Sequence, residues 1–298
     1  MPVGVLTALA LLLAPRGAAE VFKTPVWSDR PASSFEVVLD GSPATVQSVQ
    51  SADTHLILLL VLDTVSRADR AAVARTAVIE KLADLGPKYY AGILTAQDGL
   101  EVQQAPIRGR KRLRQKLESL DVRGVPGLLD VVVQTSRIAD ETLGAADVRL
   151  AVLFLTDGEI EDYRGDYTIP VVNPSDRSDL SRRFRSQLIL ERVRSITDSL
   201  ASAQAPLFFL HLARQYDDLN EVYQSGISEF ARVTGGRALF AAGVQEIAAM
   251  AEQLLDEIAA HSVLTIEADC VGLHRLEVRA DGASARHKEV VRCGQSGS

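Results

Sequence analysis

Two acidic residues each stand at the end of an apolar run, where a buried strand would finish. Asp63 closes the run Leu56–Asp63 (LILLLVLD), and Asp157 follows the run Leu150–Thr156 (LAVLFLT). Carboxylate oxygens are suitable ligands for a hard cation such as Mg²⁺. The alternative is that both acids merely end their strands and cap the turns that follow.

More acidic residues follow Asp157, namely Glu159, Glu161, Asp162 and Asp166. Clustered carboxylates can collect Ca²⁺, but this stretch lacks the glycine placement and alternating oxygen ligands of an EF-hand loop. A solvated acidic loop is therefore the preferred interpretation. Some twenty residues, by rough count, separate Asp157 from the next expected helix, and a loop of that length on a rigid core is typical of a binding element.

Basic side chains gather at residues 108–116 and again at 182–194, and such clusters can grip phosphates. However, Leu113 and Leu117 mark the first cluster as an ordinary amphipathic helix, and no aromatic residues alternate with the basic ones. The formal net charge of -7 also disfavours a polyanionic partner. We therefore expect no nucleic-acid binding.

Known catalytic signatures are missing from the sequence. It contains no HExxH, GxSxG, GxGxxG, Walker loop or CxxC motif. The five histidines are scattered along the chain, and His55 and His211, on or beside expected strands, are interpreted as structural residues. We expect a protein without enzymatic activity, and a catalytic group assembled only in space remains the alternative.

The first residues have the pattern of a signal peptide. An apolar run, Val3–Leu13, precedes small residues suited to cleavage near Ala19; it is too short to span a bilayer, and no cysteine follows it to carry a lipid anchor. Only Cys270 and Cys293 occur. In an oxidising compartment their disulfide would contribute roughly 3 kcal/mol in the chain-entropy model. We expect a secreted or periplasmic protein with no membrane span in the mature chain.

The middle of the chain alternates between strand-like and helix-like segments. Expected strands cover 56–63, 89–96, 100–105, 150–156, 206–211 and 237–240, and expected helices cover 69–85, 108–120, 128–139, 182–202, 219–233 and 244–260. This alternation predicts an α/β fold, a Rossmann-like and mostly parallel sheet with helices on both faces. The turn Gln97-Asp98-Gly99 predicts a hairpin that places 100–105 as an antiparallel edge strand.

Short β segments flank this α/β region. Residues 35–41 precede it, and 263–266, 275–279 and 289–292 follow it. Because they bracket the core, we expect them to pair with one another as a small β appendage, with 35–39 beside the C-terminal strands.

The chain resembles a von Willebrand factor A domain over residues 54–261 in four features: a strand ending in LDT, the hairpin edge, a later strand ending in FLTDGE, and FARVTGGRALF before the last strand. The flanking FEVVLDGSPATVQSVQ and the C-terminal β segment resemble the exported bacterial group called VWFA-related, typical of Acidobacteria. The resemblance implies a Rossmann-like sheet with a metal-ion-dependent adhesion site at the C-terminal ends of its strands.

That implied site is degenerate in this chain. The family pattern is Asp-x-Ser-x-Ser, a Thr on a second loop and an Asp on a third; Asp63 and Asp157 match the two acids. Val65 and Arg67 fall where the two Ser ligands belong, and the loop 123–127 offers no hydroxyl. We expect no cofactor, with the Arg67 guanidinium supplying positive charge beside the acids. A non-standard site for Mg²⁺ or another divalent cation remains open.

Together these observations divide the chain into a signal peptide (1–19), an N-terminal β segment (20–53), a VWA-like domain (54–261) and a C-terminal β segment (262–298). The expected function is an exported interaction or adhesion module with a protein or cell-surface partner. Its binding face would include Arg67, Glu159, Glu161 and Asp162. The alternatives are an enzyme of unknown reaction and a VWA domain with a non-standard metal site.

Overall fold

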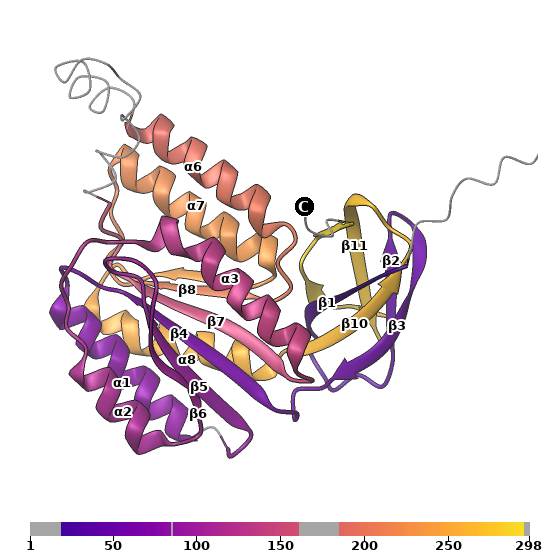
Figure 1. The fold of residues 1–298 in the computed structure, drawn as a ribbon, viewed down its shortest axis with the longest axis horizontal. Coiled ribbons are helices and arrows are strands. Elements are labelled where there is room, and N and C mark those ends of the chain that lie inside the picture. Colours follow the sequence, from indigo (N-terminus) through magenta and orange to yellow (C-terminus); the bar gives the residue numbers. More distant parts are fainter. Residues whose placement is uncertain (1–18, 85, 161–184, 295–298) are drawn as a thin grey trace, which may run out of the picture.

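The computed structural model describes residues 19–84, 86–160 and 185–294, which form two lobes side by side (Figure 1). An α/β lobe is built from the middle of the chain, and a β lobe is built from the segments before and after it. The expected signal peptide, apart from Ala19, lies outside the described residues, as do Glu161 and Asp162.

The sheet of the α/β lobe has the strand order β6-β5-β4-β7-β8-β9. Its strands are β4 (Leu56–Asp63), β5 (Tyr89–Thr95), β6 (Glu101–Ile107), β7 (Arg149–Thr156), β8 (Leu207–His211) and β9 (Ala238–Phe240). All neighbours are parallel except β5 and β6, which confirms the antiparallel edge. The hairpin turn places Asp98 at φ 60° and Gly99 at φ 107°, a conformation that an Asp-Gly pair tolerates well.

Helices cover both faces of this sheet (Figure 1). They are α1 (Ala68–Asp84), α2 (Arg110–Ser119), α3 (Leu128–Ala145), α6 (Arg185–Leu200), α7 (Asp218–Thr234) and α8 (Val244–Ala260). Alternate residues of the central strands point to opposite faces. Thus Phe154 packs in the core with α3, α6 and α7, while Leu153 packs in the core with α1, α2 and α8. The predicted α/β sheet is confirmed for this lobe.

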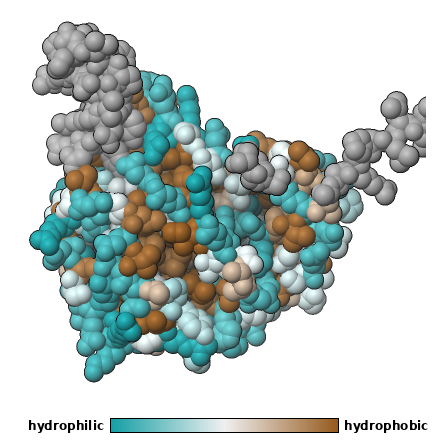
Figure 2. All heavy atoms as spheres, viewed as in Figure 1, coloured by the Kyte–Doolittle hydropathy of each residue, from teal (hydrophilic) through white to brown (hydrophobic). Residues whose placement is uncertain are grey.

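The helix α3 is longer than expected from the sequence. It was expected to end at residue 139, and it continues to Ala145. Within the described ranges, none of the helices combines the length and apolar character needed to cross a membrane. Figure 2 shows a mostly hydrophilic surface on one side of the molecule, with hydrophobic residues visible over both lobes.

The β lobe is larger than the small appendage expected from the sequence. Eight antiparallel strands form it: β1 (Glu20–Trp27), β2 (Phe35–Leu39), β3 (Ser42–Gln50), β10 (Ser262–Ala268), β11 (Gly272–Ala280), β12 (Ala283–Ser284), β13 (Arg286–His287) and β14 (Val290–Cys293). The strand β2 pairs with β11, which confirms the pairing predicted for residues 35–39. The sheet also curls, because β13 pairs with β1 at one end whereas β14 returns to β11 at the other. A Rossmann-like description therefore fits only one of the two lobes.

A disulfide joins Cys270 and Cys293 in the β lobe, with their Cα atoms 5.6 Å apart. The predicted pairing is thus confirmed. Both cysteines are buried beside apolar residues of the strands, including Leu264, Leu276 and Val291. The bond closes the C-terminal strands over the small core of this lobe.

Arg149, at the first residue of β7, joins the two lobes. Its side chain is wholly buried and donates to four main-chain carbonyl oxygens. One guanidinium nitrogen bonds Ala259 and His261, each at 2.8 Å, and the other bonds Ala52 at 2.6 Å and Thr54 at 3.1 Å. Ala52 and Thr54 lie where the chain enters the α/β lobe, and Ala259 and His261 lie where it leaves. One side chain therefore binds both segments that connect the two lobes.

Other contacts extend this junction. The indole N–H of Trp27 donates to the carbonyl oxygen of Glu257 at 2.8 Å, and the Arg286 guanidinium lies 3.8 Å from the indole ring centroid. The buried Lys288 donates to the carbonyl oxygen of Ala203 at 2.7 Å. The β lobe is therefore bonded to the α/β lobe at several points.

Candidate functional site

Asp63 and Asp157 come together at the C-terminal ends of two neighbouring parallel strands. Asp63 ends β4 and is in register with Thr156, the last residue of β7, so Asp157 follows directly beside it. The main-chain N–H of Asp157 donates to the carbonyl oxygen of Asp63 at 3.2 Å. Both side chains are wholly buried.

The Asp157 carboxylate is held by the main chain that leads into α1. Its Oδ2 atom accepts from three consecutive N–H groups, those of Val65 at 2.7 Å, Ser66 at 2.8 Å and Arg67 at 3.2 Å. Free N–H groups at a helix start stabilise negative charge, and the helix dipole adds to the effect. Val65 and Arg67, at the positions where the resemblance would place hydroxyl ligands, thus contribute their main-chain N–H groups.

Arg67 contacts this site through its main chain and not through its guanidinium. The side chain is exposed, and within the described residues it forms no ion pair with Asp63 or Asp157. The amide nitrogen of Arg67 lies beside Asp157, but the predicted charge contribution of its guanidinium is not supported by an ion pair in the described part of the chain. The donors observed at the Asp157 carboxylate are the main-chain N–H groups at the helix start.

Asp63 is bound from two other directions. Its Oδ1 accepts from the N–H of Gly127 at 2.9 Å, and its Oδ2 accepts from the hydroxyl of Thr156 at 2.9 Å. Burial raises the pKa of Asp63 to about 7, against the effect of these two hydrogen bonds, and the neighbouring Asp157 raises it further. A Cβ on Gly127 would lie 2.1 Å from the carbonyl oxygen of Ala96, so only glycine fits where this loop meets the carboxylate.

The exposed rim of the site is formed by Ser66, Arg67 and Glu159. The Ser66 hydroxyl donates to Glu159 Oε1 at 2.8 Å and lies 3.4 Å from Asp157 Oδ2. Ser66 and Arg67 are exposed, and Glu159 is half-buried. This rim presents a hydroxyl and charges of both signs above the two buried acids.

His211 is a further residue of the site, at the end of β8 and in register with Thr156. It is wholly buried, and burial lowers its pKa to about 4, so it is neutral at physiological pH. Its Nε2 atom has no hydrogen-bond partner in the described part of the chain, and a Cβ on Gly158 would lie 2.1 Å from it. From the sequence, His211 was expected to be a structural residue and not part of a site.

Gly127 and Thr156, which bind Asp63, were not singled out from the sequence. The position of Thr156 at the end of an apolar run, next to Asp157, is the one sequence feature that could have indicated it. Gly127 donates through its main-chain N–H, a group that almost every residue type has, so the residue type gives no sign of this contact.

The described residues offer few uncommitted side-chain oxygens for a divalent cation at the strand ends. Asp157 Oδ1 is buried without a partner and could serve as a ligand, but Asp157 Oδ2 and both Asp63 oxygens already accept hydrogen bonds. Across residues 19–84, 86–160 and 185–294, the only three His, Cys, Asp or Glu side chains close enough to share an ion are Glu20, Cys270 and Cys293. Both of these cysteines are in the disulfide.

Comparisons with protein-family models and with curated proteins found no match for this chain. Among solved structures, a von Willebrand factor type A protein from Catenulispora acidiphila is 10% identical, with a TM-score of 0.47 over 94% of this chain and 74% of that one. The PilB minor pilin from Streptococcus sanguinis is 11% identical, with a TM-score of 0.49 over 72% of this chain and 63% of the pilin. An aerotolerance-related membrane protein from Bacteroides fragilis is 11% identical, with a TM-score of 0.42 over 68% of this chain and 99% of that one.

Proposed function

We propose that this protein is an exported interaction module whose α/β lobe binds a protein or cell-surface partner through its strand-end loops without a divalent cation. The observation that carries this proposal is the capture of the Asp157 carboxylate by three consecutive main-chain N–H groups. In this arrangement the start of α1 supplies the positive potential that a cation supplies in an intact adhesion site.

The rim supports direct contact with a partner. Arg67 and Glu159 offer charges of opposite sign, and Ser66 offers a hydroxyl. Such groups recognise polar and charged surfaces without a bridging ion. We propose that Glu161 and Asp162, which follow in the sequence, extend this binding face.

Export is part of the proposal. The Cys270–Cys293 disulfide is compatible with an oxidising compartment, since such bonds are rare in the reducing cytosol. We propose a signal peptide at 1–19, β segments at 20–53 and 262–298, and the interaction module between them at 54–261.

The second candidate is a divalent cation site of unusual composition. The buried Asp157 Oδ1, which has no partner among the described residues, favours it. Its ligands would have to include water and main-chain oxygens, because the hydroxyls of the family pattern are missing.

Thermal unfolding with and without divalent ions separates the two candidates. We expect no change in melting temperature in millimolar Mg²⁺, Ca²⁺ or Mn²⁺. A site with a dissociation constant of about 10 μM would add about 2.7 kcal/mol at about 1 mM ion, enough to raise the melting temperature by several degrees. Such a rise, abolished by Asp63→Ala or Asp157→Ala, would restore the metal-dependent function.

Binding to a surface fraction tests the interaction face itself. Labelled full-length protein should bind the cell-envelope fraction of its host equally well with and without a chelator. The double variant Arg67→Glu/Glu159→Lys inverts the rim charges and should weaken this binding at least about tenfold. Arg137→Glu, at an exposed position on α3, is the control and should bind normally. Equal binding by both variants would remove the strand-end face from consideration.

A further inference from the structure

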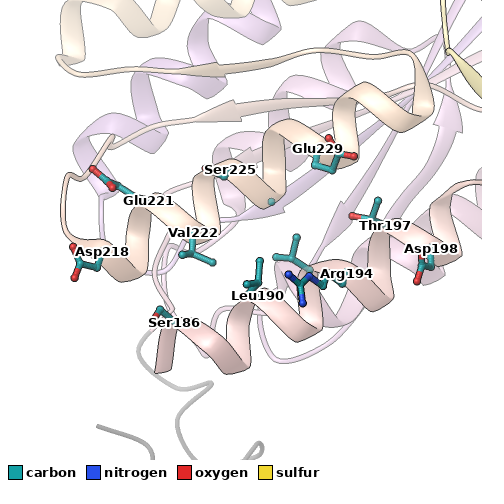
Figure 3. Close-up of a pocket in the computed structure, with 12 residues that line it drawn as sticks. Ser186, Leu190, Arg194, Thr197, Asp198, Asp218, Glu221, Val222, Ser225 and Glu229 are labelled. Carbon is teal, nitrogen blue, oxygen red and sulfur yellow. The ribbon is translucent and has the colours of Figure 1, made fainter. Parts of the chain in front are cut away.

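A groove of about 810 Å³ runs between α6 and α7, on the face of the α/β lobe that also carries α3 (Figure 3). It is separate from the strand-end site, because none of its lining residues belongs to the group around Asp63 and Asp157. Figure 3 shows Leu190 and Val222 projecting toward one another from the two helices. The groove is therefore a second surface with a defined shape.

The floor of the groove is apolar and closely packed. Val193 on α6 and Gly226 on α7 touch so closely that a Cβ on Gly226 would lie 2.4 Å from a Val193 methyl carbon. Both are buried, whereas Leu190 and Val222 on either side remain half-buried and in contact with solvent. Covering such side chains with a partner's apolar groups is favourable.

The rim of the groove is acidic. Asp198, Asp218, Glu221 and Glu229 line it, against one cation, Arg194. Glu229 is bonded to Arg232 of its own helix, but the other three carboxylates form no ion pair with any described residue. Among the described lining residues the carboxylates outnumber the single cation Arg194, and this excess gives the groove a negative potential.

We infer that this groove binds an amphipathic segment of another protein, one that carries apolar side chains on one face and Lys or Arg beside them. The apolar face would cover Leu190 and Val222, and the basic side chains would meet Asp218 and Glu221. A helix presented in this way is a common mode of recognition for an apolar groove. The same charges disfavour nucleic acids, anionic lipids and acidic peptides.

A designed peptide tests the inference on the full-length protein. The probe is a fluorescent peptide of about 18 residues with Leu on one helical face and Lys on the other. A Leu/Glu peptide with the same apolar pattern and a Ser/Lys peptide without an apolar face are the comparison probes. The Leu/Lys peptide should bind at least about tenfold more tightly than either, as measured by anisotropy, because only it complements both floor and rim.

Matched variants locate the binding. Ser225→Trp fills the groove from an exposed position on α7 and should weaken binding at least about tenfold, whereas Ser195→Trp, exposed on α6 outside the groove, should not change it. The double variant Asp218→Lys/Glu221→Lys should also weaken binding. Its control, Glu141→Lys/Glu252→Lys, makes the same change in net charge at exposed positions elsewhere and should bind normally.

Three results would overturn the inference. The first is absent or equally weak binding of all the peptides, and the second is binding that Ser225→Trp leaves intact. The third is self-association of the protein, seen by sedimentation and abolished by Ser225→Trp, which would assign the groove to a second copy of this chain.

Discussion

The two ends of the α/β sheet bury opposite charges in the same manner. At the C-terminal strand ends, Asp63 and Asp157 accept hydrogen bonds from main-chain N–H groups and one threonine hydroxyl. At the N-terminal ends, Arg149 donates to four main-chain carbonyl oxygens. Among the described residues, neither end pairs its charge with a side chain of opposite charge, and main-chain groups supply most of the hydrogen bonds at both ends.

The ends differ in what covers them. Exposed Ser66 and Arg67 border the carboxylates, whereas Arg149 is enclosed by the two chain segments that connect the lobes. Burial raises the pKa of Asp63, and repulsion from the neighbouring Asp157 adds a smaller increase. A buried charge next to loops can serve recognition, while one beneath a second lobe contributes to stability.

The largest effect is expected at the enclosed end. Replacing Arg149 with Met leaves four carbonyl oxygens without their donor, and we expect a loss of about 3 to 5 kcal/mol in the free energy of unfolding. Urea denaturation measures this loss. Arg137→Met on the exposed face of α3 is the control, with an expected change within about 0.5 kcal/mol. A loss below about 1 kcal/mol for Arg149→Met would show that this residue does not hold the lobes together.

A smaller effect is expected for the second carboxylate. Asp157→Ala removes the acceptor of three N–H groups and should cost about 2 to 3 kcal/mol, because hydrogen bonds to a charged group are strong. Asp157→Asn keeps an oxygen acceptor and should cost less. The same urea experiment in the presence of a chelator should give the same differences. If the chelator alone reproduced the Asp157→Ala loss in the wild type, the cation candidate would be correct.

An effect of the opposite sign is expected at Asp63. Its folded-state pKa is raised to about 7 from 3.8, so its contribution to stability is full below pH 3.8 and is lost as the pH rises to about 7. An amide at this position can accept from Gly127 and donate to Thr156 without titrating. Asp63→Asn should therefore be as stable as the wild type or more stable at neutral pH.

The pH dependence provides the control for this variant. Between about pH 4 and 7, the stability of the wild type should fall relative to that of Asp63→Asn. Parallel stability curves for the two proteins would mean that Asp63 is ionised throughout and that the environment described here does not raise its pKa.

Much of the α/β lobe could be predicted from the sequence, because strand and helix periodicities alternate clearly there. The β lobe was underestimated, since β3 (SPATVQSVQ) is mostly polar and exposed and carries little apolar pattern. The meeting of Asp63 and Asp157 followed from their places at strand ends. Their partners did not, because main-chain donors leave almost no trace in residue types. The role of Arg149 was hidden for the same reason, since any residue can supply a carbonyl oxygen.

The position of Arg149 has a mechanical consequence. The chain enters the α/β lobe near Thr54 and leaves it near His261, and both points are bonded to the same guanidinium. A partner pulling on the loops of the α/β lobe would therefore transmit tension to the β lobe along two adjacent chain segments at once. Because two chain segments share the force, each of them carries less of it. We expect the α/β lobe to resist as one unit, without unfolding progressively from one of its two ends.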